Sequence, residues 1–248
     1  MEYTLTLKRF EEVASGTRLF TFERPEGFEF CSGQYVALRF EPDQLVAQDE
    51  RGGVRSFSIA SAPHEREVCF VMREGITGFK KTMWSLEPGD TVGCTKAVGH
   101  CTIPVDDGKP IALLAGGVGI APVRSMVRDA VEKDDARKYV LFYSNRELKD
   151  AAFHEDMKSV ALPNFRYVFT LTNAESDAQE PGEERGYITD EMIRKHLPEW
   201  PDAHYYVIGA PAFADAMKAM LLGMGIPEAE IKIDPFTGLT GPAKTDKG

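Results

Sequence analysis

The spacing of hydrophobic positions changes part-way along the chain. In the first hundred residues, apolar and polar side chains alternate in short stretches that Gly, Pro and Ser interrupt. Alternation with a period of two is typical of strands with one buried face. The pattern therefore predicts an antiparallel barrel or sandwich, with strands near 3–7, 19–22, 36–40, 68–72 and 91–92. One helix is expected at about 79–86, and the acidic segment 41–53 is expected to be a solvated connector.

After residue 110, continuous apolar runs alternate with amphipathic segments. The runs predict buried strands at 111–115, 139–144, 165–170, 205–208 and 231–233. Apolar residues at helical spacing in 123–131 and 213–224 predict helices between them. Strands that alternate with helices indicate a doubly wound parallel sheet. We expect the polar stretch 172–185 to be a surface loop and the domain boundary to lie near 105–110.

Charge and composition exclude several classes of function. The chain carries 29 Lys and Arg against 39 Asp and Glu, a net charge of −10, which disfavours a nucleic-acid partner. Its longest uncharged run, 110–123, is too short to span a bilayer. The four Cys and five His show neither Cys-x-x-Cys nor His-Glu-x-x-His spacing, so no metal site is expected. The opening residues lack an apolar signal-peptide core, so the expected location is the cytoplasm.

A glycine-rich segment at 113–122 is the sharpest single motif. A hydrophobic strand leads into Gly116, Gly117 and Gly119, and a helix follows with Pro122 in its first turn. Glycines let the backbone approach a pyrophosphate, whose charge the N-terminus of a helix favours. By itself the motif also fits a glycine-rich turn without a ligand.

Two further groups of residues lie in the first half. An Arg, an aromatic ring and hydroxyls on one strand can hold a phosphorylated planar cofactor, although a surface Arg beside a core Phe also fits. These residues are Arg55, Ser56, Phe57 and Ser58. A glycine and lysines at a helix start can hold a second phosphate, although solvated lysines also fit. These residues are Gly78, Phe79 and Lys80.

Taken together and in this order, the segments resemble the ferredoxin–NADP reductase-like flavoproteins over nearly the whole chain. The flavin motif Arg-x-Tyr/Phe-Ser is matched at 55–58, and the element before it is matched at 32–35 with Ser32 in place of Pro. The remaining matches are the flavin-diphosphate segment at 78–83, the dinucleotide loop at 116–122, the Cys-Gly-Pro-Pro element at 208–211 and the terminal Glu-x-Phe-x-Gly-Tyr motif at 234–239.

The resemblance implies two domains and an activity. Residues 1–107 would form an antiparallel Greek-key β-barrel that binds FAD, and residues 108–248 would form a doubly wound, five-stranded parallel NAD(P)-binding domain. The chain would take hydride from NAD(P)H to FAD, with FMN a less favoured flavin. It would pass electrons to a ferredoxin, a flavodoxin, an oxygenase component or a free small acceptor, because it shows no iron–sulfur domain. The alternative is a non-catalytic flavin- or nucleotide-binding subunit of a larger complex.

The resemblance also implies roles for residues near the flavin. Arg55 would pair with a flavin phosphate, Phe57 would pack on the flavin, and Ser58 would hydrogen-bond near its N5 atom. Phe236 would cover the opposite face of the ring and move aside before nicotinamide stacks. Ser58 and Phe236 are therefore the expected catalytic residues.

Other residues would bind the dinucleotide. Phosphate contacts are expected from the glycine loop, and Gly209 and Pro211 would border the nicotinamide. The choice between NADP and NAD depends on the end of the second parallel strand, where Asn145 and Arg146 are expected to contact the nucleotide. Arg146 favours NADP, and the neighbouring Glu147 keeps NAD open.

Overall fold

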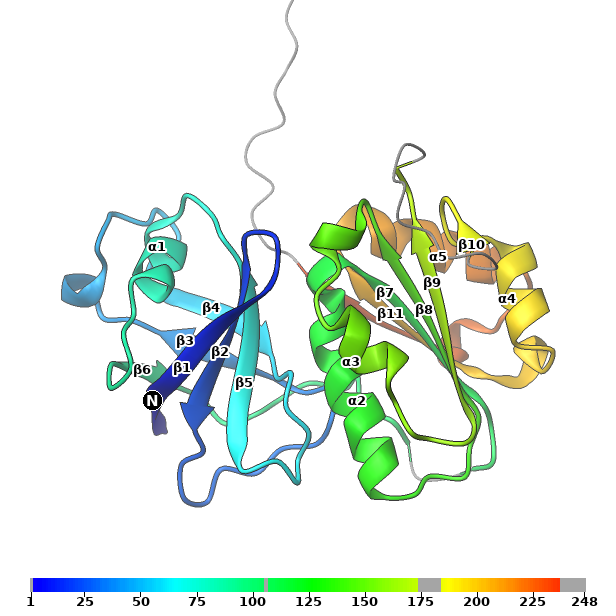
Figure 1. Cartoon of the computed structure of the whole chain (residues 1–248), viewed down its shortest axis with the longest axis horizontal. Coiled ribbons are helices and arrows are strands. Elements are labelled where there is room, and N and C mark those ends of the chain that lie inside the picture. The colour runs from blue at the N-terminus through cyan, green and yellow to red at the C-terminus, as the bar shows by residue number, and fades with distance from the viewer. Residues whose placement is uncertain (1, 105–106, 174–183, 237–248) are drawn as a thin grey trace, which may run out of the picture.

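The computed structural model describes residues 2–104, 107–173 and 184–236, and contains two sheets that lie side by side (Figure 1). The first sheet holds the strands β1 (Tyr3–Ala14), β2 (Thr17–Glu23), β3 (Tyr35–Arg39), β4 (Val54–Ser58), β5 (Glu67–Arg73) and β6 (Thr91–Cys94). The second holds β7 (Ile111–Gly116), β8 (Tyr139–Asn145), β9 (Phe165–Leu171), β10 (Glu184–Arg185), β11 (His204–Gly209) and β12 (Ile231–Pro235).

The first sheet is antiparallel, with the order β4-β3-β6-β1-β2-β5. Beyond β4, the backbone N–H of Ala60 donates to the carbonyl of Cys69 in β5 at 2.8 Å, so the two ends of the sheet meet. The closed sheet is the predicted Greek-key barrel. Its interior is filled by alternate side chains such as Phe20, Phe22 and Phe70, and the helix α1 (Gly78–Trp84) closes one end with Phe79 and Met83.

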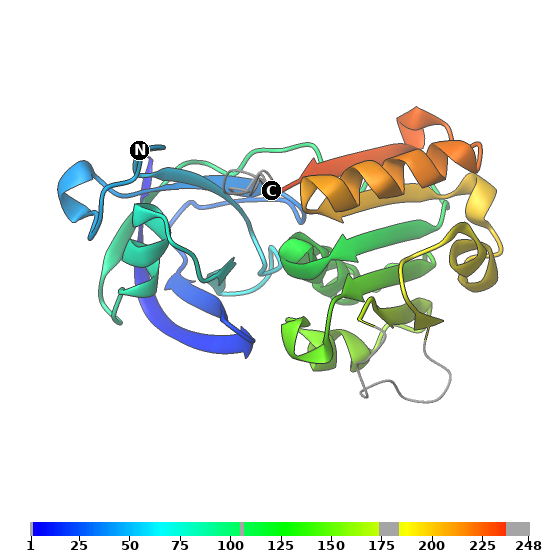
Figure 2. The same cartoon turned by 90° about the horizontal axis from the view of Figure 1, so that it is seen from above.

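The second sheet is parallel, with the order β10-β9-β8-β7-β11-β12, and is covered by helices on both faces (Figure 2). The helices are α2 (Ile120–Glu132), α3 (His154–Lys158), α4 (Asp190–His196) and α5 (Pro211–Gly223). Short 3₁₀ turns occur at η1 (Pro42–Gln44), η2 (Gly117–Gly119), η3 (Leu148–Asp150), η4 (Trp200–Asp202) and η5 (Glu228–Glu230). All seven residues of β8 are buried, as expected for a strand between two helical layers.

Several sequence predictions need correction. The parallel sheet has six strands rather than five, because β10 pairs with β9 at the edge. Its two residues are too few to show a period, and they belong to the segment 172–185 that was predicted to be a loop. The predicted helix 79–86 begins at Gly78 and ends at Trp84, since Thr77 caps it by accepting from the backbone N–H of Lys80. Val131, expected on the buried face of its helix, is 39% exposed.

The predicted domain limits at 107 and 108 fall in the connection between β6 and β7, and they stay a prediction. Residues 237–239 of the terminal motif and most of the segment 172–185 lie outside the described residues. Within the described ranges, no helix has the length and apolar character needed to cross a membrane.

Specific hydrogen bonds join the two sheets. The hydroxyl of Ser32, in the connection between β2 and β3, donates to the Asp129 carboxylate of α2 at 2.8 Å, and both side chains are buried. The guanidinium of Arg124, also in α2, donates to the carbonyl of Ala60 at 2.8 Å. The barrel is thus held against α2 at two points.

Candidate active site between the two sheets

Strand β4 presents different side chains on its two faces, because side chains alternate along a strand. Arg55 and Phe57 point toward α1. The Phe57 ring stacks on Phe79 with centroids 5.7 Å apart and planes 24° apart, and the Arg55 guanidinium lies 5.5 Å from the Phe79 ring centroid. Ser56 and Ser58 belong to the opposite face, and Ser56 is exposed.

Ser58 connects the barrel to the parallel sheet. Its hydroxyl donates to Oδ2 of Asp234, in β12, at 3.3 Å, although the two residues are 176 positions apart. Burial raises the pKa of Asp234, and the hydrogen bond from Ser58 only partly offsets this effect. The pair therefore joins the two sheets through a carboxyl group whose pKa lies above its ordinary value. The sequence motif at 234–239 does not by itself indicate a role for Asp234. The one signal for such a role is its position two residues before Phe236.

Phe236 follows β12 at the carboxyl edge of the parallel sheet. Its backbone N–H donates to the carbonyl of Gly209 at 2.8 Å, which fixes the end of β12 against β11. The ring is half-buried against the core cluster that contains Cys101 and Ile208. Phe236, Gly209 and Asp234 are therefore brought together at one edge of the sheet.

The predicted dinucleotide glycines are required for different reasons. A methyl group on Gly116 or Gly209 would come within 2.9 Å or 2.8 Å of the Phe213 ring, so both glycines make room for that aromatic side chain. A methyl on Gly119 would lie 2.3 Å from the carbonyl oxygen of Ile208.

Gly117 alone among these glycines has a positive φ, of 53°, and open space on the side where a side chain would stand. The Tyr143 hydroxyl donates to the carbonyl of Gly117 at 3.2 Å and so helps to fix the turn. Pro122 is buried in the first turn of α2, and Pro211 is the first residue of α5. The loop thus leaves open space at Gly117, next to the start of a helix.

The predicted flavin-phosphate residues surround an acid. Asp49, whose side chain is only 2% exposed, accepts from Arg55 at 2.5 Å and from the backbone N–H of Phe79 at 2.8 Å. The segment 41–53 is therefore not a fully solvated connector, because Asp49 turns inward to reach these donors. Arg55 and the backbone N–H of Phe79, at the start of α1, thus donate to the two oxygens of one carboxylate.

The other residues of this segment are occupied within the protein. The Phe79 ring is fully buried between aromatic neighbours, and its backbone N–H is taken by Asp49. Lys80 donates from Nζ to the carbonyl of Arg73 at 2.9 Å, and burial lowers its pKa. A side chain on Gly78 would meet the carbonyl oxygen of Ala47 at 2.1 Å, so this glycine is required by the connector.

The end of β8 carries the predicted nucleotide-selecting residues. Asn145 is buried, and its amide N and O have no hydrogen-bond partner among the described residues. Arg146 is exposed, whereas Glu147 pairs with Lys149 at 2.5 Å and accepts from Asn173 at 3.1 Å. Of the two charged candidates, Glu147 is thus the one engaged within the protein.

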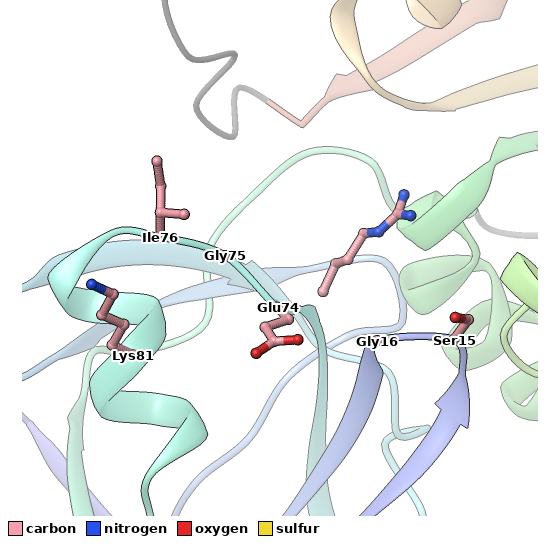
Figure 3. Close-up of a pocket in the computed structure, with 7 residues that line it drawn as sticks. Ser15, Gly16, Glu74, Gly75, Ile76 and Lys81 are labelled. Carbon is pink, nitrogen blue, oxygen red and sulfur yellow. The ribbon is translucent and has the colours of Figure 1, made fainter.

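A cavity of about 520 Å³ lies beside the start of α1, between the β1–β2 turn and the connection from β5 to α1. Gly16 and Ser15 line it on one side, and Glu74, Gly75 and Ile76 line it on the other (Figure 3). The Ile76 side chain is 87% exposed. Sequence reasoning assigned nothing to this cavity.

Comparison with known proteins shows what this chain is similar to. A model described as the oxidoreductase NAD-binding domain matches residues 113–219. The ferredoxin–NAD(P)⁺ reductase component of the naphthalene 1,2-dioxygenase/salicylate 5-hydroxylase systems of Ralstonia sp. is 26% identical over 93% of this chain. Residues 113–219 thus match the oxidoreductase NAD-binding domain family, and over most of its length the chain is similar to a ferredoxin–NAD(P)⁺ reductase component.

A second relative is also named as a reductase component of a dioxygenase. Reductase component 2 of terephthalate 1,2-dioxygenase from Comamonas sp. is 25% identical over 86% of the chain. The chain spans 68% of the Ralstonia relative and 61% of the Comamonas relative.

Solved structures confirm the fold of the reductase-like chain. A ferredoxin NADP⁺ reductase from Neisseria gonorrhoeae with bound FAD and NADP superposes with a TM-score of 0.75 at 20% identity, over 94% of this chain and 98% of that one. The cytochrome P450 reductase of Amycolatopsis gives a TM-score of 0.78 at 24% identity, over 94% of this chain and 70% of that one.

Proposed function

We propose that this chain takes hydride from NAD(P)H onto a bound FAD and passes the electrons to a separate acceptor. The contact between Ser58 of the barrel and Asp234 of the parallel sheet carries the proposal. In open parallel sheets, ligands bind beyond the carboxyl ends of the strands. The hydroxyl expected to face the flavin therefore stands at the edge where a dinucleotide would bind.

The residues of the barrel suit a flavin phosphate. Arg55 and the backbone N–H of Phe79 already hold a carboxylate, and the same donors pair well with phosphate oxygens. Phe57 would pack against the flavin ring, and Ser58 would hydrogen-bond to it. When bound, FAD supplies the redox chemistry, and the protein supplies position and polarity.

The chain's own residues set the surroundings of the reaction. Asp234, whose pKa is raised by burial, accepts from the Ser58 hydroxyl and so fixes the direction in which that hydroxyl points. Phe236 covers the site at the sheet edge and excludes water until nicotinamide displaces it. Gly117, with open space beside it, is where the dinucleotide phosphates would approach the backbone.

NADP is the proposed nucleotide. The exposed Arg146 suits a 2′-phosphate, and Glu147, which would accept from the ribose of NAD, is occupied by Lys149 and Asn173. FAD is proposed over FMN because the resemblance implies it, and the cavity beside Gly75 and Ile76 is the proposed place for its adenosine.

The proposed acceptor is an oxygenase component or a small electron-carrier protein. Two relatives are named as reductase components of dioxygenase systems. With a net charge of −10, the chain would need a local group of Lys and Arg to dock an acidic carrier.

An anaerobic titration tests the function. The purified chain, reconstituted with FAD, is mixed with NADPH and separately with NADH while the oxidised-flavin absorbance is followed. Rapid bleaching, faster with NADPH, is expected. Bound flavin that neither nucleotide reduces would refute the reductase and favour a flavin-binding subunit without this activity.

A further inference from the structure

Asp49 is an acid buried where the proposed function requires a phosphate. Its Oδ1 atom accepts from Arg55 at 2.5 Å and from the backbone N–H of Arg51 at 3.0 Å, and its Oδ2 atom accepts from the backbone N–H of Phe79 at 2.8 Å. Three donors from two separate segments thus converge on one carboxylate.

The carboxylate is held in its charged form. Burial alone would raise the pKa of Asp49, but the hydrogen bonds from Phe79, Arg51 and Arg55 bring it below its ordinary value. A buried charge is tolerated only when it is paired and hydrogen-bonded, which these donors achieve. The site is therefore complete as an anion site without any ligand.

The connector fits closely over the first turn of α1. The backbone N–H of Val46 donates to the Thr82 hydroxyl at 3.1 Å. A side chain on Gly78 would lie 2.1 Å from the carbonyl oxygen of Ala47 and 3.0 Å from Cβ of Asp49. Asp49 is thus placed by a packed segment and not by a freely moving surface loop.

We propose that Asp49 is an internal phosphate mimic, which a flavin phosphate must displace from Arg55 in order to bind. The inference rests on the proposed function. Two anions cannot share these donors without strong repulsion, so the phosphate replaces the carboxylate. Because one anion is exchanged for another on the same donors, the phosphate adds little net affinity. The isoalloxazine contacts, and not the phosphate, then dominate flavin binding, and the flavin exchanges readily.

The test compares three flavins that share one ring system. Riboflavin has no phosphate, FMN has one and FAD has two. Their dissociation constants are measured with the flavin-free full chain by quenching of flavin fluorescence. In the wild type, we expect FMN to bind within about tenfold of riboflavin, because its phosphate only replaces the Asp49 carboxylate on the same donors.

Asp49→Asn keeps the shape of the side chain and its ability to accept from Phe79, but removes the charge. It is expected to tighten FMN and FAD binding about tenfold or more while riboflavin changes less than about twofold, because only the phosphates meet the freed Arg55. Asp43→Asn is the matched control: Asp43 is exposed on the same connector, and its substitution changes the net charge equally. It should leave all three constants unchanged.

Several results would overturn the proposal. Weaker FAD binding by Asp49→Asn would mean that Asp49 positions Arg55 for the phosphate, and an equal change for all three flavins would mean that the phosphate binds elsewhere. A wild-type preference for FMN over riboflavin above about a hundredfold would refute it without any variant, even if Asp49→Asn failed to fold. If no flavin bound the wild type, the proposed function itself would fall; flavin binding with no response to Asp49→Asn would remove only this inference.

Discussion

The substitution Gly119→Ala tests how the dinucleotide loop is built. The added methyl would lie 2.3 Å from the carbonyl oxygen of Ile208 and 3.0 Å from Cα of Gly209. Both atoms belong to the backbone of β11, which is paired on both sides by β7 and β12, so they cannot move away alone. We expect this variant to lose stability through overpacking at a position predicted only to bind phosphate.

The magnitude follows from the contact. Overpacking in a dense core costs about 1–3 kcal/mol of unfolding free energy. Because the atoms that oppose the methyl group belong to the main chain, we expect a loss near the upper end, about 3 kcal/mol. For a chain of this length, that loss corresponds to a fall in melting temperature of roughly 6–12 °C. Thermal melting followed by circular dichroism, with urea unfolding as a second measurement, gives the change in the free energy of unfolding.

Two other glycines serve as controls. Gly117→Ala meets no atom but must adopt a positive φ, so we expect a smaller loss of about 1–2 kcal/mol together with weaker dinucleotide binding. Gly223→Ala, at the end of α5 in open space, should be neutral or stabilising by up to about 1 kcal/mol. A Gly119→Ala variant within about 0.5 kcal/mol of the wild type would show that the close approach to β11 is wrong.

Four further substitutions test the proposed site. Ser58→Ala should slow flavin reduction about tenfold in stopped-flow absorbance, since one hydrogen bond is lost, with most flavin still bound; an unchanged rate would count against its role. Burial raises the pKa of Asp234, so the wild type loses stability as pH rises through that pKa and the carboxyl group ionises. Asp234→Asn cannot ionise, so in urea unfolding it should become more stable relative to the wild type between about pH 4 and pH 7. A difference that does not change with pH would contradict the assignment. Arg146→Gln should weaken NADPH binding about tenfold or more in equilibrium titration and leave NADH binding unchanged, whereas equal losses would exclude a 2′-phosphate contact. Phe236→Ser should strengthen nicotinamide stacking, seen as tighter nucleotide binding or faster reduction, and no change in either would remove its role as a cover.

The fold was largely predictable because its signals are local. Continuous apolar runs located the five long strands of the parallel sheet, and alternation located the strands of the barrel. The edge strand β10 could not be predicted, because two residues show no period and their pairing with β9 is decided by tertiary contact. The start of α1 was misplaced by one residue, although Thr77 was an available capping signal.

The site was less predictable because its decisive contacts join distant residues. Asp49 reaches a backbone N–H 30 positions away, and an acidic connector gives no local sign that one of its acids is buried. Ser58 and Asp234 come from different sheets, so neither spacing nor composition could pair them. The glycines were correctly located as a loop, but the reason for Gly116 depends on Phe213, whose ring arrives from the start of α5.

The junction between the barrel and α2 has a consequence for how the protein could be altered. Besides the buried Ser32–Asp129 hydrogen bond, a side chain on Gly33 would lie 2.1 Å from the carbonyl oxygen of Cys101 and 2.5 Å from Cε of Met126. A hinge at this junction would have to break a buried hydrogen bond and open a close main-chain contact. The separation between the proposed flavin site and the proposed nicotinamide site is therefore set when the chain folds, before any ligand arrives. Surface loops that bind a different electron acceptor could consequently be exchanged without changing that separation.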